Sequence, residues 1–96
     1  MIRLESQTLN ELTEFRRALH SHPEISGEES ETAKRVISFL QGFGPDRIIK
    51  NIGGHGLLAE FRGRSKGPTV MFRCELDALP LEENNKIPYR SAYPGK

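Results

Sequence analysis

Residues 69–96 read TVMFRCELDALPLEENNKIPYRSAYPGK, and the first eight of them decide the fold class. Branched and apolar side chains dominate residues 69–76, which favours a β-strand. Met71 and Phe72 are adjacent and both apolar, so the pattern predicts a strand that is covered on both faces inside a larger sheet. After Asp77, three prolines and an Asn-Asn pair interrupt any helical or strand period.

Two further strands are expected upstream of this one. Residues 47–52 read RIIKNI and residues 56–63 read GLLAEFRG, and the Gly-Gly-His-Gly turn joins them. The connection from Gly63 to Pro68 is short enough for an antiparallel hairpin to the strand at 69–76.

A first helix is expected near residues 7–20. Thr8 and Glu11 match a capping box, and the apolar residues that follow recur on one helical face. Pro23 disfavours helical geometry at His22, so the helix ends by about that point.

A second helix is expected to open at the capping pattern Ser26-x-x-Glu29 and to close at Gly42 and Gly44. Its buried stripe is Ala33, Val36, Ile37 and Leu40. The fold class is therefore α/β, with two N-terminal helices followed by three strands.

Length and charge narrow the function classes. The chain has 96 residues, which is one small domain or part of one. Its 14 basic and 13 acidic residues are interspersed, giving a net charge of +1, so we expect no nucleic-acid partner and no anionic membrane surface. The N-terminus has no apolar signal segment and the apolar runs are too short to span a bilayer, so we expect the protein to be located in the cytoplasm.

The single cysteine, Cys74, is expected to be a small buried strand residue rather than a nucleophile.

The histidines have structural explanations beside the functional ones. His20 and His22, with Glu24, could meet a metal if the segment were extended. A histidine in the last turn of a helix can instead bind free carbonyls, and this interpretation is preferred for His20. His55 is expected to be a turn residue.

Three pairs of acidic residues are candidate sites. Glu28-Glu29 is expected to complement a helix N-terminus, and Glu82-Glu83 is expected to be an ordinary hydrated surface charge. Glu75 and Asp77 are better candidates, because carboxylates at the carboxyl end of a buried strand stand where α/β sheets place their ligands. Alternatively, Asp77 caps its own turn or Arg73 pairs with either carboxylate.

Five fragments in order resemble the metal-dependent amidohydrolases of the aminoacylase and carboxypeptidase family, in particular its hippurate hydrolase, N-acyl-amino-acid hydrolase and auxin-conjugate hydrolase branch. They are Phe15-Arg16-Arg17-x-Leu19-His20-x-His22-Pro23-Glu24, Glu28-Glu29-x-x-Thr32-Ala33, Gly53-Gly54-x-Gly56, Gly67-Pro68-Thr69-Val70 and Arg73-x-x-x-Asp77-Ala78-Leu79-Pro80. The resemblance covers nearly the whole chain. It departs from the branch at Glu75, where an aspartate is common, and at Cys74, which replaces a small residue.

The resemblance implies that residues 1–96 are the opening part of a mixed-sheet catalytic domain, with no second domain present. It implies two divalent metal ions, zinc, manganese or cobalt, in the complete enzyme, and no metal ligand within this chain, because the His-x-Cys-Gly-His-Asp run of the family follows the segment matched by Tyr89 to Gly95. It places Asp77 near the metal site as an orienting group.

The function expected from the resemblance is hydrolysis of the amide bond of N-acyl amino acids or short peptides. The 96-residue chain by itself is expected to be inactive and to bind no metal. The alternative is a non-catalytic product that acts as a binding or assembly module. An uncovered apolar sheet face on so small a piece also predicts self-association.

Overall fold

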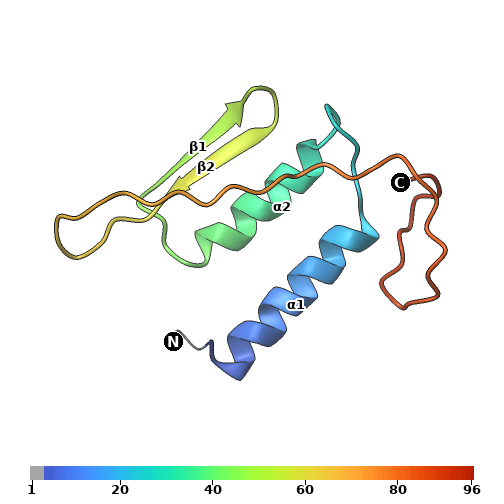
Figure 1. The fold of residues 1–96 in the computed structure, drawn as a ribbon, viewed down its shortest axis with the longest axis horizontal. Helices are drawn as coiled ribbons and strands as arrows, with labels where there is room; N and C mark the ends of the chain where they lie inside the picture. The colour runs from blue at the N-terminus through green and yellow to red at the C-terminus, as the bar shows by residue number, and fades with distance from the viewer. Residues whose placement is uncertain (1–3) are drawn as a thin grey trace. The chain divides into compact units, whose positions relative to one another are not determined.

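The computed structural model describes residues 4–96, which form two helices and one two-stranded sheet (Figure 1). Helix α1 spans Ser6–Ser21 and helix α2 spans Ser30–Gln41, and strands β1 and β2 span Arg47–Ile52 and Gly56–Glu60. The chain divides into two compact units. One contains α1 and residues 79–96, and the other spans Glu24–Ala78. No helix among residues 4–96 is long and apolar enough to cross a membrane.

Helix α1 forms where its apolar period predicts, but its ends differ in detail. The N-cap is Glu5, whose side chain makes no capping hydrogen bond, and Thr8 already lies inside the helix. The capping box predicted at Thr8 is therefore wrong. At the other end the Ala18 carbonyl accepts the backbone N–H of His22 and lies 3.0 Å from His22 Nδ1. His22, not His20, thus binds the free carbonyl of the last turn.

Helix α2 packs against β2 and contains the only two buried residues among those described, Thr32 and Ala33. The predicted apolar stripe is confirmed, since Ala33 is buried and Val36, Ile37 and Leu40 are partly buried. The helix begins at Ser30 with Glu29 as its N-cap, three residues later than the N-cap predicted at Ser26, and Gly42 follows its last turn as expected.

Strands β1 and β2 form an antiparallel hairpin whose register pairs Arg47 with Glu60 and Ile49 with Leu58. The register shifts between Ile49 and Ile52, where Asn51 adopts a φ of 57°. Gly56 has a steric role, because a Cβ there would lie 2.5 Å from the Ile52 carbonyl oxygen. The first two predicted strands are confirmed, although β2 ends at Glu60 rather than at residue 63.

The third predicted strand is not formed. Residues 69–76 run as an irregular segment, drawn in Figure 1 without an arrow, and no strand among residues 4–96 pairs with them. Val70 and Phe72 are 72% and 94% exposed, so the expectation of a strand covered on both faces is wrong for the described chain. Cys74 is exposed too, contrary to its predicted burial.

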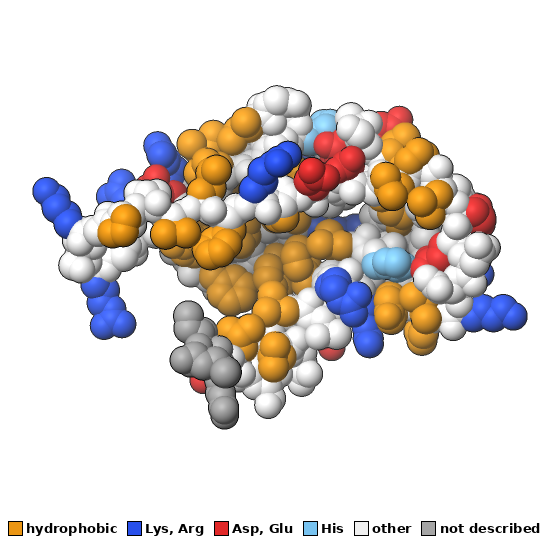
Figure 2. All heavy atoms as spheres, viewed as in Figure 1, with side chains coloured by type: hydrophobic (Ala, Val, Ile, Leu, Met, Phe, Trp, Pro, Cys, Tyr) orange, Lys and Arg blue, Asp and Glu red, His pale blue; other side chains and the backbone are white. Residues whose placement is uncertain are grey.

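The physical reason is that an apolar run becomes a strand only when a neighbouring strand accepts its backbone hydrogen bonds. Among residues 4–96, the only ladder contact near the segment is an isolated parallel bridge between Ile25 and Ala78, in which the Ala78 N–H donates to the Glu24 carbonyl at 2.8 Å. Apolar side chains, drawn in orange, consequently remain at the surface on the face shown in Figure 2.

Candidate functional site

Glu24, which follows the proline that ends the first helical pattern, binds the start of helix α2. Its Oε1 accepts hydrogen bonds from the Thr32 hydroxyl at 2.6 Å and from the Thr32 backbone N–H, and its Oε2 lies 3.4 Å from the Glu31 nitrogen. These backbone groups belong to the first turn of α2, whose N–H groups have no partner within the helix. Glu24 therefore caps α2 from eight residues upstream, a role that sequence reasoning missed.

The ionisation of Glu24 reflects two opposed effects. Burial by itself would raise the pKa of this carboxyl. The hydrogen bonds from Thr32 and Glu31, together with the charge of Arg35, outweigh burial and hold the pKa of Glu24 below its ordinary value. Glu24 is thus a structural carboxylate that stays ionised.

A groove of about 370 Å³ lies within residues 24–78 and is lined by three of the six acidic candidates. Its lining includes Glu29, Ile52, the hairpin turn Gly53, His55 and Gly56, and residues 73–77. The structure thereby brings the candidates Glu75 and Asp77 together with Glu29 and His55. The sequence had predicted separate roles for the last two, Glu29 at a helix N-terminus and His55 in a turn.

Glu29 is the unusual member of this groove. Its Oε1 is buried and has no hydrogen-bond partner among the described residues. Glu29 occupies the N-cap position of α2, but its side chain makes no capping hydrogen bond there. The prediction that it complements the helix N-terminus holds by position only, because Glu24 supplies the hydrogen bonds. An unpaired buried carboxylate oxygen is costly unless a donor or cation satisfies it.

Arg73 contacts Glu75 at 3.5 Å, as one of the alternatives anticipated. Counting Glu29, Glu75 and Asp77 against Arg73, the groove is lined by more acidic than basic side chains. It can accept hydrogen-bond donors or cationic groups. By themselves the described residues do not form a metal centre here, because no three His, Cys, Asp or Glu side chains among residues 4–96 are arranged to hold an ion.

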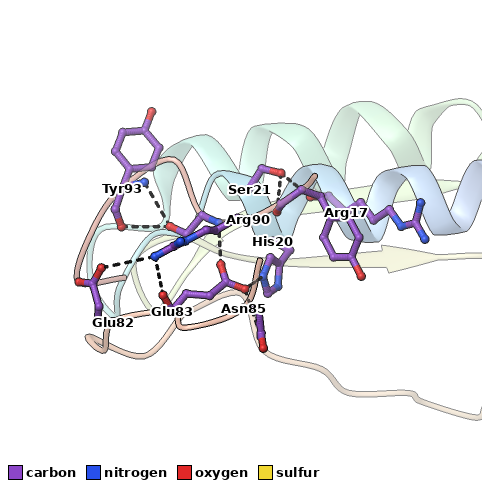
Figure 3. Close-up of polar contacts among 10 residues, drawn as sticks. Arg17, His20, Ser21, Glu82, Glu83, Asn85, Arg90 and Tyr93 are labelled. Atoms are coloured by element: carbon purple, nitrogen blue, oxygen red, sulfur yellow. Dashed lines mark hydrogen bonds and ion pairs between the residues drawn. The ribbon is translucent and has the colours of Figure 1, made fainter. Parts of the chain in front are cut away.

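A second polar cluster joins α1 to the segment 79–96, and Glu83 is its centre (Figure 3). Glu83 Oε2 lies 2.7 Å from His20 Nε2, and Glu83 Oε1 accepts the Ser91 backbone N–H at 2.7 Å. Arg90 donates to the Glu83 carbonyl at 2.7 Å.

The Glu83 side chain is only 10% exposed, so the prediction of a fully hydrated surface charge is wrong for this residue. The Ser91 N–H, and after it the His20 side chain, hold the pKa of Glu83 below its ordinary value. Glu82 is different, because it is largely exposed and reaches Arg90 only at 3.9 Å, as expected of a surface charge.

Tyr89 is held by the last turns of α1 in the same cluster. The His20 ring meets the Tyr89 ring edge-on with centroids 5.5 Å apart, and the Arg17 guanidinium lies 4.6 Å from the centroid of that ring. Ser21 Oγ donates to the Tyr89 carbonyl at 2.9 Å, and the Ala92 N–H donates to the Ser21 carbonyl at 2.9 Å. These contacts fix the backbone of residues 89–92 on the helix.

The metal alternative for His20, His22 and Glu24 is not supported by their partners. His20 binds Glu83, His22 binds the Ala18 carbonyl, and Glu24 caps α2. The contacts of His20 with Glu83 and Tyr89 span more than sixty residues of sequence, so no local pattern indicates them. The one available signal was that His20, Tyr89 and Ser91 all belong to segments matched by the family resemblance.

Comparison with known proteins identifies the relatives of this chain. No protein-family model matches it. It is 41% identical over 85 residues to the putative amidohydrolase YhaA of Bacillus subtilis, covering 88% of this chain and 21% of that protein. It is 34% identical over 93 residues to the N-acyl-L-amino acid amidohydrolase of Geobacillus stearothermophilus, covering 97% and 25% of the two chains.

Among solved structures, the fold matches the YXEP protein of Bacillus subtilis, which is described as a dinuclear metal-binding peptidase of the M20 family. The TM-score is 0.86 at 33% identity, over 96% of this chain and 26% of that one. The described chain therefore spans about a quarter or less of the length of these relatives. Similar sequence and similar fold together show that the chain belongs to the family of metal-dependent amidohydrolases and M20 peptidases.

Proposed function

We propose that the protein carrying these residues hydrolyses the amide bond of N-acyl amino acids or short peptides, using two divalent metal ions of zinc, manganese or cobalt. The observation that carries the proposal is the match, at 33–41% identity, to an amidohydrolase and to a dinuclear metal-binding peptidase over most of this chain. An N-acyl-L-amino acid amidohydrolase among the relatives supports the substrate class. The metals, when bound, would supply an activated water and polarise the scissile carbonyl.

The proposal assigns residues 1–96 a supporting role without activity of their own. A dinuclear centre needs several ligands at short distances, and the described residues do not group three of them. Asp77 is proposed as a positioning residue near the centre. Its place in an acidic groove beside Glu29 and Glu75 supports that role.

The test is a hydrolysis assay on N-acetyl amino acids and on hippurate, with zinc, manganese or cobalt added in separate reactions. The protein made from the complete reading frame is expected to release free amino acid, while residues 1–96 alone release none. In the active protein, Asp77→Asn is expected to lower kcat with a smaller effect on KM, whereas Glu82→Gln, on an exposed loop, leaves both unchanged. Hydrolysis by residues 1–96 alone would overturn the assignment of a supporting role.

A second candidate function is that of a non-catalytic binding or assembly module. The observation in its favour is the exposed apolar segment 69–76, which has no strand partner in the described chain. The hydrolysis assay separates the two, because a module would show no activity from the complete reading frame with any of the three metals.

A further inference from the structure

The two oxygens of the Glu83 carboxylate have partners in different parts of the chain (Figure 3). Oε1 accepts the backbone N–H of Ser91, eight residues further along. Oε2 lies 2.7 Å from Nε2 of His20, which belongs to the last turn of α1. The first contact therefore closes a loop of residues 83–91, and the second joins that loop to the helix.

The loop of residues 83–91 is closed by further contacts of its own. The Arg90 guanidinium donates to the Glu83 carbonyl at 2.7 Å, and the Arg90 backbone N–H donates to the Ile87 carbonyl at 3.1 Å. Neither contact, nor the one from the Ser91 N–H, involves a residue of α1. The loop can consequently stay closed without the helix.

Few hydrogen bonds hold the closed loop and the residue after it on α1. Ser21 Oγ donates to the Tyr89 carbonyl at 2.9 Å, and the Ala92 N–H donates to the Ser21 carbonyl at 2.9 Å. Among the hydrogen bonds between these parts of residues 4–96, only the contact of His20 with Glu83 joins two ionisable side chains. The Glu83 side chain is 10% exposed, so water does not readily replace a lost partner there.

We propose that Glu83 is a two-sided latch. One carboxylate oxygen keeps the loop of residues 83–91 closed and the other holds the closed loop on α1, so that acid releases the loop from the helix without opening it. This latch does not depend on the proposed catalytic function.

The order of release follows from the chemistry of a carboxyl group. A protonated carboxyl has one carbonyl oxygen and one hydroxyl. The carbonyl oxygen can still accept the Ser91 N–H. The hydroxyl then faces the Nε2–H of His20, because an imidazole carries a proton on both nitrogens in acid. Two donors that face each other form no hydrogen bond, so the contact with the helix is lost first.

Other charged groups around the latch do not change this order. They are Arg16, Arg17 and His22 at the end of α1, Lys86 and Arg90 in the loop, and Glu82 just before it. None of them has a recorded contact with the Glu83 carboxylate among residues 4–96, where Asn85 Nδ2 lies 3.4 Å from Oε2. The Ser91 N–H, and after it His20, hold the pKa of Glu83 below its ordinary value of 4.5. The latch is therefore intact above pH 4.5 and is released as the pH falls below it.

Hydrogen exchange at two neighbouring amides distinguishes the two sides of the latch. The Ser91 N–H bonds within the loop, and the Ala92 N–H bonds to α1. Residue-resolved exchange is measured by mass spectrometry on the protein made from the complete reading frame, from about pH 7 to about pH 3.5, with each rate corrected for the intrinsic rate at that pH. Below pH 4.5 the protection of Ala92 is expected to fall about tenfold more than that of Ser91, while amides in the middle of α1 stay protected.

Variants at position 20 test the helix side of the latch without acid. His20→Leu removes the donor to Glu83, so at pH 7 it is expected to lower the protection of Ala92 about tenfold more than that of Ser91. His20→Gln keeps an N–H donor and is expected to restore most of that protection. Glu82→Gln neutralises the neighbouring exposed carboxylate and is the matched control, which leaves the acid response unchanged.

Three results would overturn the two-sided latch. In the first, Ser91 loses protection as much as Ala92, in acid or in His20→Leu, which means that the loop opens rather than detaches. In the second, the protection of Ala92 is the same at both ends of the pH range, or is the same in His20→Leu as in the wild type. In the third, α1 loses its protection at the same pH as Ala92.

Discussion

Replacing Glu24 tests whether a side chain eight residues upstream stabilises the N-terminus of α2. Glu24→Ala removes the acceptor for the Thr32 hydroxyl and for the Thr32 and Glu31 N–H groups. Thr32 is only 6% exposed, so water cannot readily replace the lost acceptor there, whereas Glu31 is exposed and can be hydrated. Leaving buried donors unpaired costs about 1–3 kcal/mol, and losing a helix cap costs about 0.5–2 kcal/mol. The two costs overlap, so the expected loss is about 2–3 kcal/mol of the free energy of unfolding.

Two further variants separate the hydrogen bonds from the charge. Glu24→Gln keeps an oxygen that can accept from Thr32 and loses the negative charge at the helix N-terminus, so it should cost about 0.5–1 kcal/mol. Glu28→Ala is the control, because Glu28 is exposed and its side chain has no recorded interaction among the described residues. Urea unfolding followed by far-UV circular dichroism gives all three values. A Glu24→Ala variant that unfolds at the same urea concentration as Glu28→Ala would refute the capping role.

Three other results are expected. Folding lowers the pKa values of Glu24 and Glu83 from an ordinary 4.5, so the stability that these two carboxylates contribute is present above pH 4.5 and is lost as pH falls below it. Urea unfolding midpoints measured between pH 7 and pH 3 should show this loss of stability. The loss should be smaller in the Glu24→Gln, Glu83→Gln double variant. His20→Ala removes the partner of Glu83 and the edge contact with Tyr89, so amide exchange should quicken in residues 83–92, while His55→Ala leaves it unchanged. Gly56→Ala places a Cβ 2.5 Å from the Ile52 carbonyl oxygen and should cost about 1–3 kcal/mol, whereas Gly67→Ala, which meets open space, should cost little.

Local patterns predicted those elements that are stabilised by near neighbours in sequence. The apolar period of α1 and α2 and the branched residues on either side of the turn at Gly53 to Gly56 correctly indicated two helices and the strands β1 and β2. The antiparallel hairpin was predicted between residues 56–63 and 69–76, but it forms between β1 and β2. The N-cap of α2 was missed by three residues, because Glu24 and not the local serine at position 26 supplies the capping hydrogen bonds. A side chain distant in sequence can supply hydrogen bonds that a capping pattern does not contain.

The errors concern contacts that depend on distant parts of the chain. The strand predicted at residues 69–76 has the correct composition, but a strand also needs a partner, and none is present among residues 4–96. Glu83 looked like a loop carboxylate because its partners His20 and Ser91 cannot be inferred from its neighbours. For the candidate site, the sequence indicated Glu75 and Asp77. Only the structure shows that Glu29, with its unpaired Oε1, lines the same groove.

Whether these residues are part of a metal-dependent amidohydrolase can be tested by comparing two preparations in one assay. Protein made from the complete reading frame and the 96-residue chain are each incubated with N-acetyl amino acids and a divalent metal, and released amino acid is measured. We expect metal-dependent hydrolysis by the first preparation and none by the second. Hydrolysis by the 96-residue chain alone, or no hydrolysis of any N-acyl amino acid by the complete product with zinc, manganese or cobalt, would contradict this expectation.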